Sequence, residues 1–224
     1  MGESSVYLVP GGDGAAEFLE KRSRFIGSIR YVDTEEKALG QIKDLRARHH
    51  DAKHNVYAYI MRETGIMRCS DDGEPQGTAG MPVLEVLRRE KLADVLVVVT
   101  RYFGGVLLGA GGLTRAYARA AKEAVEAVGV REMQPWAAFE LFCPYPYFEP
   151  VKRELLHLGG AVSGVQYGEQ ITLDVLLPKK TAEQFGRRLA ELSGGRLSAV
   201  LKGETIRSVC QGECSSPSFP ADMD

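Results

Sequence analysis

The sequence predicts an α+β protein built from two domains. Its 224 residues exceed the usual length of one domain but fall short of three. Near residue 130 the pattern changes from mixed strands and helices to the regular order strand, helix, strand, strand, helix, strand. Hydrophobic residues at 44% and charged residues at 26% provide enough apolar material for packed cores.

In the first domain, expected over residues 1–130, a helix at about 34–48 separates two strand regions. The segment Asp33–Glu36 has the composition of a capped helix start, and apolar residues then recur at helical spacing. They are Ala38, Leu39, Ile42 and Leu45. The strand regions are 18–32 and 55–61, and the second alternates aliphatic residues with tyrosines, as is typical of a half-buried sheet.

The apolar run Val95–Val99 shows no such alternation, so we expect a central strand that is covered on both faces. One helix is predicted before it, at about 81–91, and another after it, at about 113–128. Gly129 is placed to end the later helix, whose alanines allow close approach to the sheet. Its apolar stripe consists of Leu113, Ala116, Tyr117, Ala120, Ala124 and Val128.

The second domain is expected over residues 131–210 as a βαββαβ unit of the ferredoxin-like type. Glycine pairs at 159–160 and 194–195 are placed to end its two helices. Residues 211–224, rich in serine, proline and acidic residues, are expected to be a disordered tail. The six elements are predicted at 137–143, 147–158, 161–167, 170–177, 181–192 and 197–208.

Charge and cysteine content narrow the classes of function. The 28 basic against 30 acidic residues give a net charge of −2, so any attraction to nucleic acid must be local. The four cysteines form no C-x-x-C pair, which favours free thiols and predicts neither a metal site nor a cofactor. A helix that crosses a bilayer needs about 20 apolar residues, and every apolar run in this sequence is much shorter. The sequence also shows no secretion signal, so a cytoplasmic protein is expected.

The most unusual segment is Arg101–Arg115, which holds five glycines. Glycines let backbone N–H groups face a ligand, and the helix that follows adds the positive end of its dipole. Four basic and no acidic residues lie between Arg101 and Lys122, which favours RNA phosphate as the ligand. The alternative is a tight connection followed by a solvated helix face. No Walker A motif is present, which disfavours ATP hydrolysis.

A second candidate is the acidic segment Ser70–Gly80. Its carboxylates are suited to a hard cation or a cationic group, and Thr78 can donate to phosphate. The alternative is a turn that caps the next helix. His54, which follows a basic cluster, suits a general base or a phosphate donor, and its alternative role is a structural hydrogen bond. The carboxylates are those of Asp71, Asp72 and Glu74.

Three segments together resemble the YigZ/IMPACT family: Ala52–Asn55, Ser70–Pro82 and Val97–Tyr117. The resemblance covers roughly residues 15–128. It implies a ribosomal protein S5 domain 2-like domain followed by a ferredoxin-like domain, as in domains IV and V of elongation factor G. The signature residues of the family, which we expect to bind the ligand, fall on His54, Asp71, Asp72, Glu74, Thr78, Arg101, Tyr102, Gly104, Gly105, Gly111, Gly112 and Arg115.

We therefore expect a ribosome- or RNA-associated factor linked to translation regulation, rather than an enzyme. Arg101, Arg115 and Arg119 would contact phosphates, while Tyr102 or Phe103 would stack on a base. Eukaryotic relatives act in translational control and have an additional N-terminal domain. Because this chain starts almost directly at the shared domain, we do not expect their protein partner here.

Two further expectations stay open at this point. The first is a metal-assisted hydrolase or phosphate-metabolite enzyme that uses the segments Ser70–Gly80 and Arg101–Arg115. It requires His54, the acids and Arg101 to converge, because proton transfer needs hydrogen-bond reach. The second is a protein partner bound through the sheet of the second domain. The sequence leaves the oligomeric state open.

Overall fold

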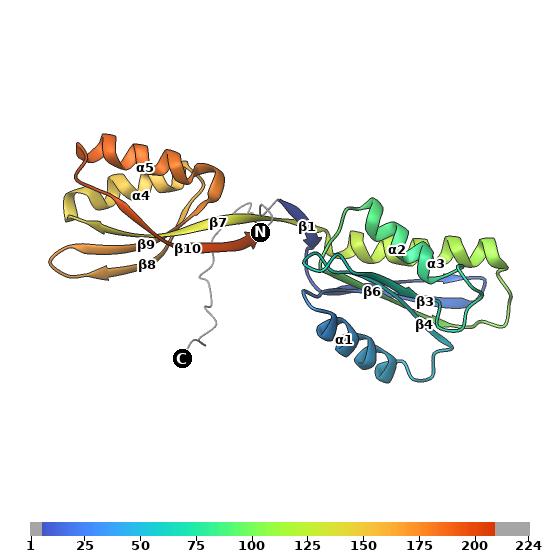
Figure 1. Cartoon of the computed structure of the whole chain (residues 1–224). Coiled ribbons are helices and arrows are strands. Elements are labelled where there is room, and N and C mark those ends of the chain that lie inside the picture. Colours follow the sequence, from blue (N-terminus) through green and yellow to red (C-terminus); the bar gives the residue numbers. More distant parts are fainter. Residues whose placement is uncertain (1–5, 209–224) are drawn as a thin grey trace. The chain divides into compact units, whose positions relative to one another are not determined.

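The computed structural model describes residues 6–208, which form two compact units (Figure 1). The first comprises Tyr7–Glu132 and the second residues 133–208. Strand β7 (Val130–Cys143) carries the chain from one unit into the other. The tail predicted at 211–224 lies outside the described residues, and 1–130 and 131–210 remain our proposed domain bounds. Within residues 6–208, no helix has the length and apolar character needed to cross a membrane.

The sheet of the first unit has five strands, all antiparallel, in the order β2–β3–β6–β4–β5. The predicted central strand is confirmed, because β6 lies in the middle and is buried from Val95 to Arg101. Strand β1 (Tyr7–Pro10) pairs with β7, and the Ala93 N–H, two residues before β6, donates to the Leu8 carbonyl at 2.9 Å. The strand bounds are β2 Gly14–Glu20, β3 Ser23–Tyr31, β4 His54–Ile60, β5 Met67–Ser70 and β6 Val95–Tyr102.

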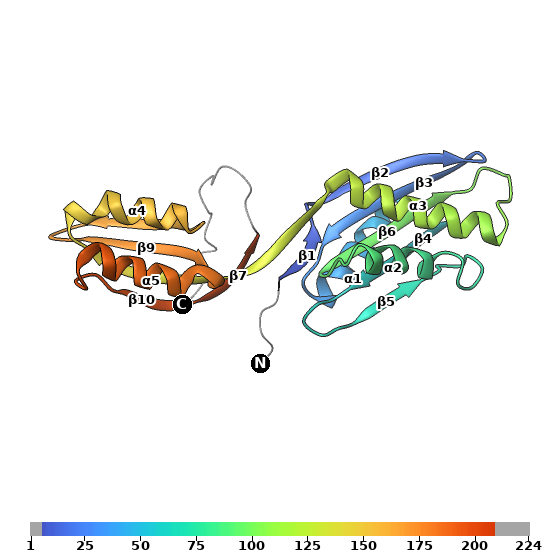
Figure 2. The same ribbon diagram turned by 90° about the horizontal axis from the view of Figure 1, so that it is seen from above.

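Helices cover both faces of this sheet: α1 (Glu35–Arg48) lies on one face, and α2 (Gly80–Arg89) and α3 (Ala110–Val128) on the other (Figures 1 and 2). The predicted N-cap of α1 is confirmed, since the Thr34 side chain accepts from the Lys37 N–H. The predicted helix face needs one correction. Leu39 is 52% exposed, because the buried stripe of α1 is narrower than the apolar pattern.

Strand β4 was expected on a half-buried sheet, and this expectation is wrong. Val56 and Ala58 pack beneath α2 and α3, while Tyr59 is buried against α1 on the opposite face. The alternation of aliphatic and tyrosine side chains therefore separates two cores. Tyr59 is tolerated in the second core because its hydroxyl donates to the Glu35 carboxylate at 2.5 Å.

The region 18–32 forms a hairpin, β2–β3, and not one continuous strand. Its turn is made by Lys21 and Arg22, both with positive φ, 44° and 67°. Such turns normally use asparagine or glycine, so the sequence contains no signal for this one. Behind the hairpin, α3 packs so closely on β3 that a Cβ at Gly27 would lie 2.4 Å from the Ala120 carbonyl oxygen.

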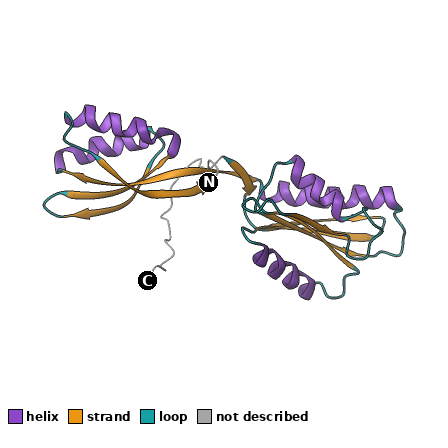
Figure 3. Cartoon of the chain, viewed as in Figure 1, coloured by secondary structure: helices purple, strands orange, loops and turns teal. Residues whose placement is uncertain are grey.

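The second unit has the predicted ferredoxin-like order, and the predicted fold class is thus confirmed. Its strands lie antiparallel in the order β10–β7–β9–β8. Both helices lie on one face of the sheet (Figure 3), and Gly194 ends the later one in the left-handed conformation. The bounds are a short 3-10 turn at Tyr145–Tyr147, then α4 Phe148–His157, β8 Ala161–Tyr167, β9 Ile171–Pro178, α5 Lys179–Ser193 and β10 Ala199–Ser208.

Candidate functional site

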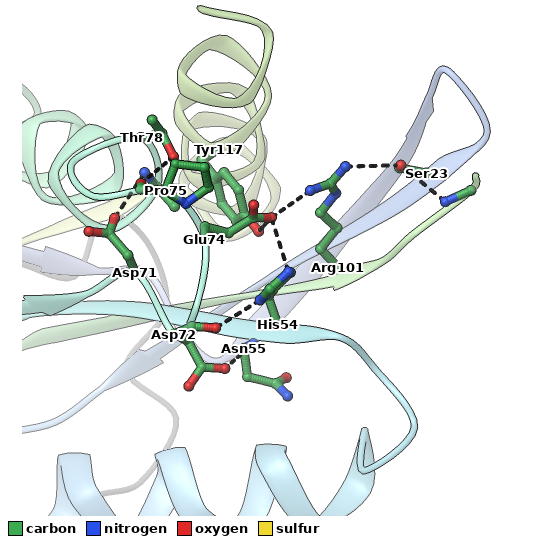
Figure 4. A network of polar contacts seen from close by, with 12 residues as sticks. Ser23, His54, Asn55, Asp71, Asp72, Glu74, Pro75, Thr78, Arg101 and Tyr117 are labelled. Carbon is green, nitrogen blue, oxygen red and sulfur yellow. Dashed lines mark hydrogen bonds and ion pairs between the residues drawn. The ribbon is translucent and has the colours of Figure 1, made fainter. Parts of the chain in front are cut away.

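A buried polar network joins the acidic segment to the start of the glycine segment (Figure 4). Arg101 Nη1 lies 2.6 Å from Glu74 Oε1, and these side chains are only 5% and 4% exposed. The Tyr117 hydroxyl donates to the same oxygen at 2.8 Å, and His54 Nε2 lies 3.8 Å from it. Burial first, and then the Glu74 carboxylate, raise the pKa of Tyr117, so its hydroxyl remains a protonated donor.

Arg101 is held from several sides. Its Nη2 donates to Ser23 Oγ at 3.4 Å, and its guanidinium carbon lies 5.4 Å from the ring centroids of both Phe25 and Phe103. A cation over aromatic faces and beside a carboxylate is compensated within the protein. We expected Arg101 to contact phosphate, but the structure places its guanidinium in the interior.

The carboxylate of Asp71 caps helix α2. It accepts hydrogen bonds from the backbone N–H groups of Gly77, Ala79 and Gly80 at 2.8 to 3.1 Å. Burial alone would raise its pKa, but these three donors outweigh burial and lower the pKa of Asp71. The second interpretation of the acidic segment, a turn that caps the following helix, therefore describes Asp71. Thr78 makes a similarly local bond, donating to the Pro75 carbonyl at 2.6 Å.

Asp72 and His54 fasten the acidic segment to strand β4. The Asp72 carboxylate accepts from the Asn55 N–H at 2.6 Å and from Arg46 Nη2 at 2.5 Å. His54 Nδ1 lies 2.8 Å from the Asp72 carbonyl oxygen. Because a carbonyl oxygen only accepts, Nδ1 carries the proton, and His54 has the structural hydrogen bond foreseen as its alternative role. Among residues 6–208, no three His, Cys, Asp or Glu side chains group as metal ligands.

Three connections meet at one end of the first unit, which we call the loop end: residues 21–22, 49–53 and 103–109. The Gly104 N–H donates to Ser23 Oγ at 3.2 Å, and a Cβ at Gly104 would lie 2.0 Å from the backbone carbon of Arg22. The Lys53 N–H donates to the Arg101 carbonyl at 3.2 Å, and Lys53 Nζ lies 5.3 Å from the centroid of Phe103. These contacts bring together residues that are far apart in the sequence.

Tyr102 is fixed just behind this surface. Its hydroxyl donates to Asp51 Oδ1 at 3.2 Å and lies 2.9 Å from His49 Nδ1. Burial first, and the nearby Arg48 second, lower the pKa of His49, so its ring is neutral near pH 7. The Tyr102 hydroxyl is therefore occupied by contacts within the protein. The exposed aromatic ring of the loop end is that of Phe103, which is 41% exposed.

The charge of the loop end is positive. Lys21, Arg22 and Lys53 are exposed, and none of them forms an ion pair within the described part of the chain. Asp51 is the one acidic residue in the three connections. The sequence contains no signal for the role of Lys21 and Arg22, because their turn has no glycine or asparagine to mark it. Gly105, with a φ of 81°, lies in the same surface.

The predicted ligand residues thus fall into two groups. The first lies in or beside the buried network, and the second lies at the loop end or in the first turns of α3. Arg115 in α3 is exposed and has no hydrogen-bonding or ionic partner in the described structure. The first group is His54, Asp71, Asp72, Glu74, Thr78 and Arg101. The second is Tyr102, Gly104, Gly105, Gly111, Gly112 and Arg115.

Comparison with known proteins identifies the domain families of the chain. The Impact N-terminal domain matches residues 21–125, and a domain of unknown function, DUF1949, matches residues 141–196. The chain is 36% identical to the IMPACT family member YvyE of Bacillus subtilis over 192 residues, which cover 85% of this chain and 88% of that protein. It is 32% identical to the IMPACT family member YigZ of Escherichia coli, with coverage of 87% and 97%.

The chain belongs to the IMPACT family, as its three motif segments indicated. A solved structure described as the crystal structure of a hypothetical protein is 31% identical to it, with a TM-score of 0.57. The match covers 87% of this chain and 96% of the solved one. Both units of the structure therefore have counterparts in known relatives.

Proposed function

We propose that this protein is a cytoplasmic RNA-binding factor that associates with ribosomes through its loop end and acts in translation regulation. The observation that carries the proposal is the meeting of three distant connections at one surface. Lys21, Arg22 and Lys53 are suited to backbone phosphates, and Phe103 offers a face on which a base can stack. Because the whole chain is slightly acidic, this local concentration of positive charge would determine where RNA binds.

The buried network supports this surface from behind. Arg101 contacts Ser23, whose hydroxyl also accepts from the Gly104 N–H. The network therefore holds the hairpin turn and the glycine loop together. In the proposed complex, Gly105 and Arg115 face the ligand, while His54, Glu74, Arg101 and Gly104 keep the loops in place.

The metal-assisted hydrolase has weaker support. Its geometric requirement is met in part, since Glu74 lies close to both His54 and Arg101. However, the carboxylates of Asp71, Asp72 and Glu74 already accept hydrogen bonds from the protein. A metal ion would have to displace these donors. At Glu74 this would break the buried ion pair with Arg101, which is costly.

Co-sedimentation with ribosomes at low and moderate salt tests the proposal. A variant with Lys21, Arg22 and Lys53 all changed to Gln should bind more weakly and depend less on salt. The slope of log affinity against log salt should fall by about 2, since each phosphate contact to a single strand contributes about 0.7. Absence of the unaltered protein from every ribosomal and RNA fraction at low salt would refute the proposal.

A matched control removes three charges from the second unit. Arg153, Lys180 and Arg187 are exposed and form no ion pair within residues 6–208. Changing these three residues to Gln alters the net charge by the same amount. The proposal predicts that this control retains most of the binding. An equal loss in both triple variants would show that overall charge, and not the loop end, determines association.

A further inference from the structure

A groove opens on the flank of the first unit, between strand β2 and helix α3. Its volume is about 250 Å³. No residue of the buried network lines it, so it is separate from the site around Glu74. Its lining comes from the end of β2, the hairpin turn, the glycine segment and α3. These residues are Phe18, Glu20, Lys21, Leu108, Gly112, Arg115, Ala116 and Arg119.

The groove combines three cations with one carboxylate. Lys21 and Arg115 form no ion pair with any described residue, so their charges are uncompensated. Arg119 is held in place, with its guanidinium carbon 4.1 Å from the Phe18 ring centroid and its Nε 2.7 Å from Glu123 Oε1. Glu20 is the only acidic residue in the lining. In a groove with apolar walls, positive side chains concentrate their electrostatic field on a bound anion.

Gly112, in the first turn of α3, also lines this groove. The first backbone bond within the helix runs from the Leu113 N–H to the Gly109 carbonyl, so the N–H of Gly112 has no acceptor in the helix. Gly112 also has no side chain to fill the groove. A Cβ there would lie 3.0 Å from the Leu108 Cβ, so alanine would crowd the wall.

We propose that this groove binds a terminal phosphate monoester, at the end of an RNA chain or on a small phosphorylated metabolite. A monoester carries close to two negative charges near neutral pH, since its second pKa is about 6, whereas a phosphodiester carries one. Lys21 and Arg115, the two cations of the groove that form no ion pair with any described residue, match the doubly charged group. The apolar wall of Phe18, Leu108 and Ala116 suits the uncharged part next to the phosphate. With RNA as the source, this inference rests on the proposed function and specifies which part of the RNA is recognised.

Binding of three probes to the purified full chain tests the groove. They are a short oligoribonucleotide with a 5′-phosphate, the same oligonucleotide with a 5′-hydroxyl, and a nucleoside monophosphate. The phosphorylated oligonucleotide should bind about tenfold or more tightly than its hydroxyl partner, the gain expected from charge-assisted hydrogen bonds. The variant Arg115→Gln should remove most of that difference, and Arg187→Gln, which alters an exposed arginine of the second unit, should not.

The nucleoside monophosphate distinguishes the two sources. If it binds as tightly as the phosphorylated oligonucleotide and depends on Arg115, the ligand is a small metabolite. If only the oligonucleotide binds, the ligand is an RNA end. Equal binding of the two oligonucleotides, or no binding of any phosphorylated probe at low salt, would overturn the inference. Lys21→Gln provides a second variant in case Arg115→Gln alters the thermal unfolding midpoint.

The proposed function and the groove can fail separately. Ribosome co-sedimentation of the unaltered protein tests the first, and the probes alone test the second. Arg115-dependent binding of the nucleoside monophosphate without ribosome association would leave the groove standing and remove the ribosomal role. Ribosome association without any preference for the 5′-phosphate would support the ribosomal role and refute the phosphate site in the groove.

Discussion

Arg101 and Glu74 form an ion pair inside the first unit, with Arg101 Nη1 2.6 Å from Glu74 Oε1. Arg101 belongs to the central strand β6, and Glu74 to the connection between β5 and α2. Tyr117 of α3 donates to the same carboxylate oxygen. One oxygen atom therefore connects the sheet, the acidic segment and the long helix, and we expect the stability of the loop end to depend on it.

Replacing Glu74 by Gln should destabilise the protein by about 3–5 kcal/mol, because the Arg101 charge would stay buried without a compensating charge. Urea unfolding at pH 7 measures this loss. The control is Glu63→Gln, which changes an exposed carboxylate and should shift stability by less than about 0.5 kcal/mol. Similar unfolding midpoints for the Glu74 and Glu63 variants would show that the buried pair contributes little.

Removing both charges should cost less than the two single changes together. The double variant Glu74→Leu with Arg101→Leu leaves no unpaired charge in the interior, and buried ion pairs replaced by apolar residues often have little net effect. A double-mutant cycle with the two single leucine variants measures the coupling. Strictly additive losses would mean that the two side chains act independently.

Asp71→Ala should destabilise helix α2 by about 1–2 kcal/mol at pH 7, the usual cost of losing a cap. Because the folded state lowers the pKa of Asp71, its contribution is present above the unfolded value of about 4 and is lost as pH falls through the folded pKa. The difference between this variant and the unaltered protein should therefore shrink in acid. Unfolding curves at pH 7 and pH 3 test this, and a constant difference would contradict the capping role.

The strands and helices were largely predictable, because each follows from a local pattern such as the apolar run at Val95–Val99. The buried network was not. Tyr117 has the spacing of an apolar stripe residue, and nothing in the sequence shows that its hydroxyl reaches Glu74. The part of Lys21 and Arg22 in the loop end was missed for a similar reason, because Lys21 and Phe103 are brought together only by tertiary pairing of β3 with β6. Local periodicity contains no information about such distant contacts.

Gly104→Ala should disturb the loop end, because the added Cβ would lie 2.0 Å from backbone atoms of Arg22 that cannot move independently. We expect a loss of about 1–3 kcal/mol in unfolding free energy, as for other overpacked positions, and weaker RNA binding. The control is Gly40→Ala in the middle of α1, where nothing lies within 4 Å of the added atom. That change should stabilise the helix by about 0.5–1 kcal/mol. Destabilisation by the control, or none by Gly104→Ala, would refute this packing argument.

Tyr59 should make the protein sensitive to alkali. Burial first, and then the hydrogen bond to Glu35, raise the pKa of Tyr59 to about 12. In the unfolded chain the pKa of tyrosine is about 10, so the stabilising contribution of Tyr59 is fully present below pH 10. Between pH 10 and 12 the unfolded state binds fewer protons than the folded state, and the unfolding free energy therefore falls as pH rises. Tyr59→Phe should be about 1 kcal/mol less stable at pH 8, and this deficit should narrow by pH 11. Unfolding at both pH values measures it, and a deficit that widens would contradict the prediction.

Stacking and charge at the loop end should be separable by their salt dependence. Phe103→Ala removes an exposed ring and no charge, so it should weaken single-stranded RNA binding by about 1–3 kcal/mol without changing the salt slope. Lys53→Gln removes one phosphate contact and should lower the slope by about 0.7. Fluorescence anisotropy with a short oligoribonucleotide at several salt concentrations measures both quantities.

Leu107→Ala is the control for the loss of exposed apolar surface, because Leu107 is 82% exposed in the same connection. Leu107→Ala should change the RNA affinity by no more than a small factor, and it should leave the salt slope unchanged. Since the Phe103 ring also lies near the Arg101 guanidinium, unfolding curves must show that Phe103→Ala remains folded. If Phe103→Ala stays folded and binds RNA as tightly as the unaltered protein, the loop end holds RNA by charge alone. If it lowers the salt slope as Lys53→Gln does, the ring acts by positioning Lys53 and not by stacking.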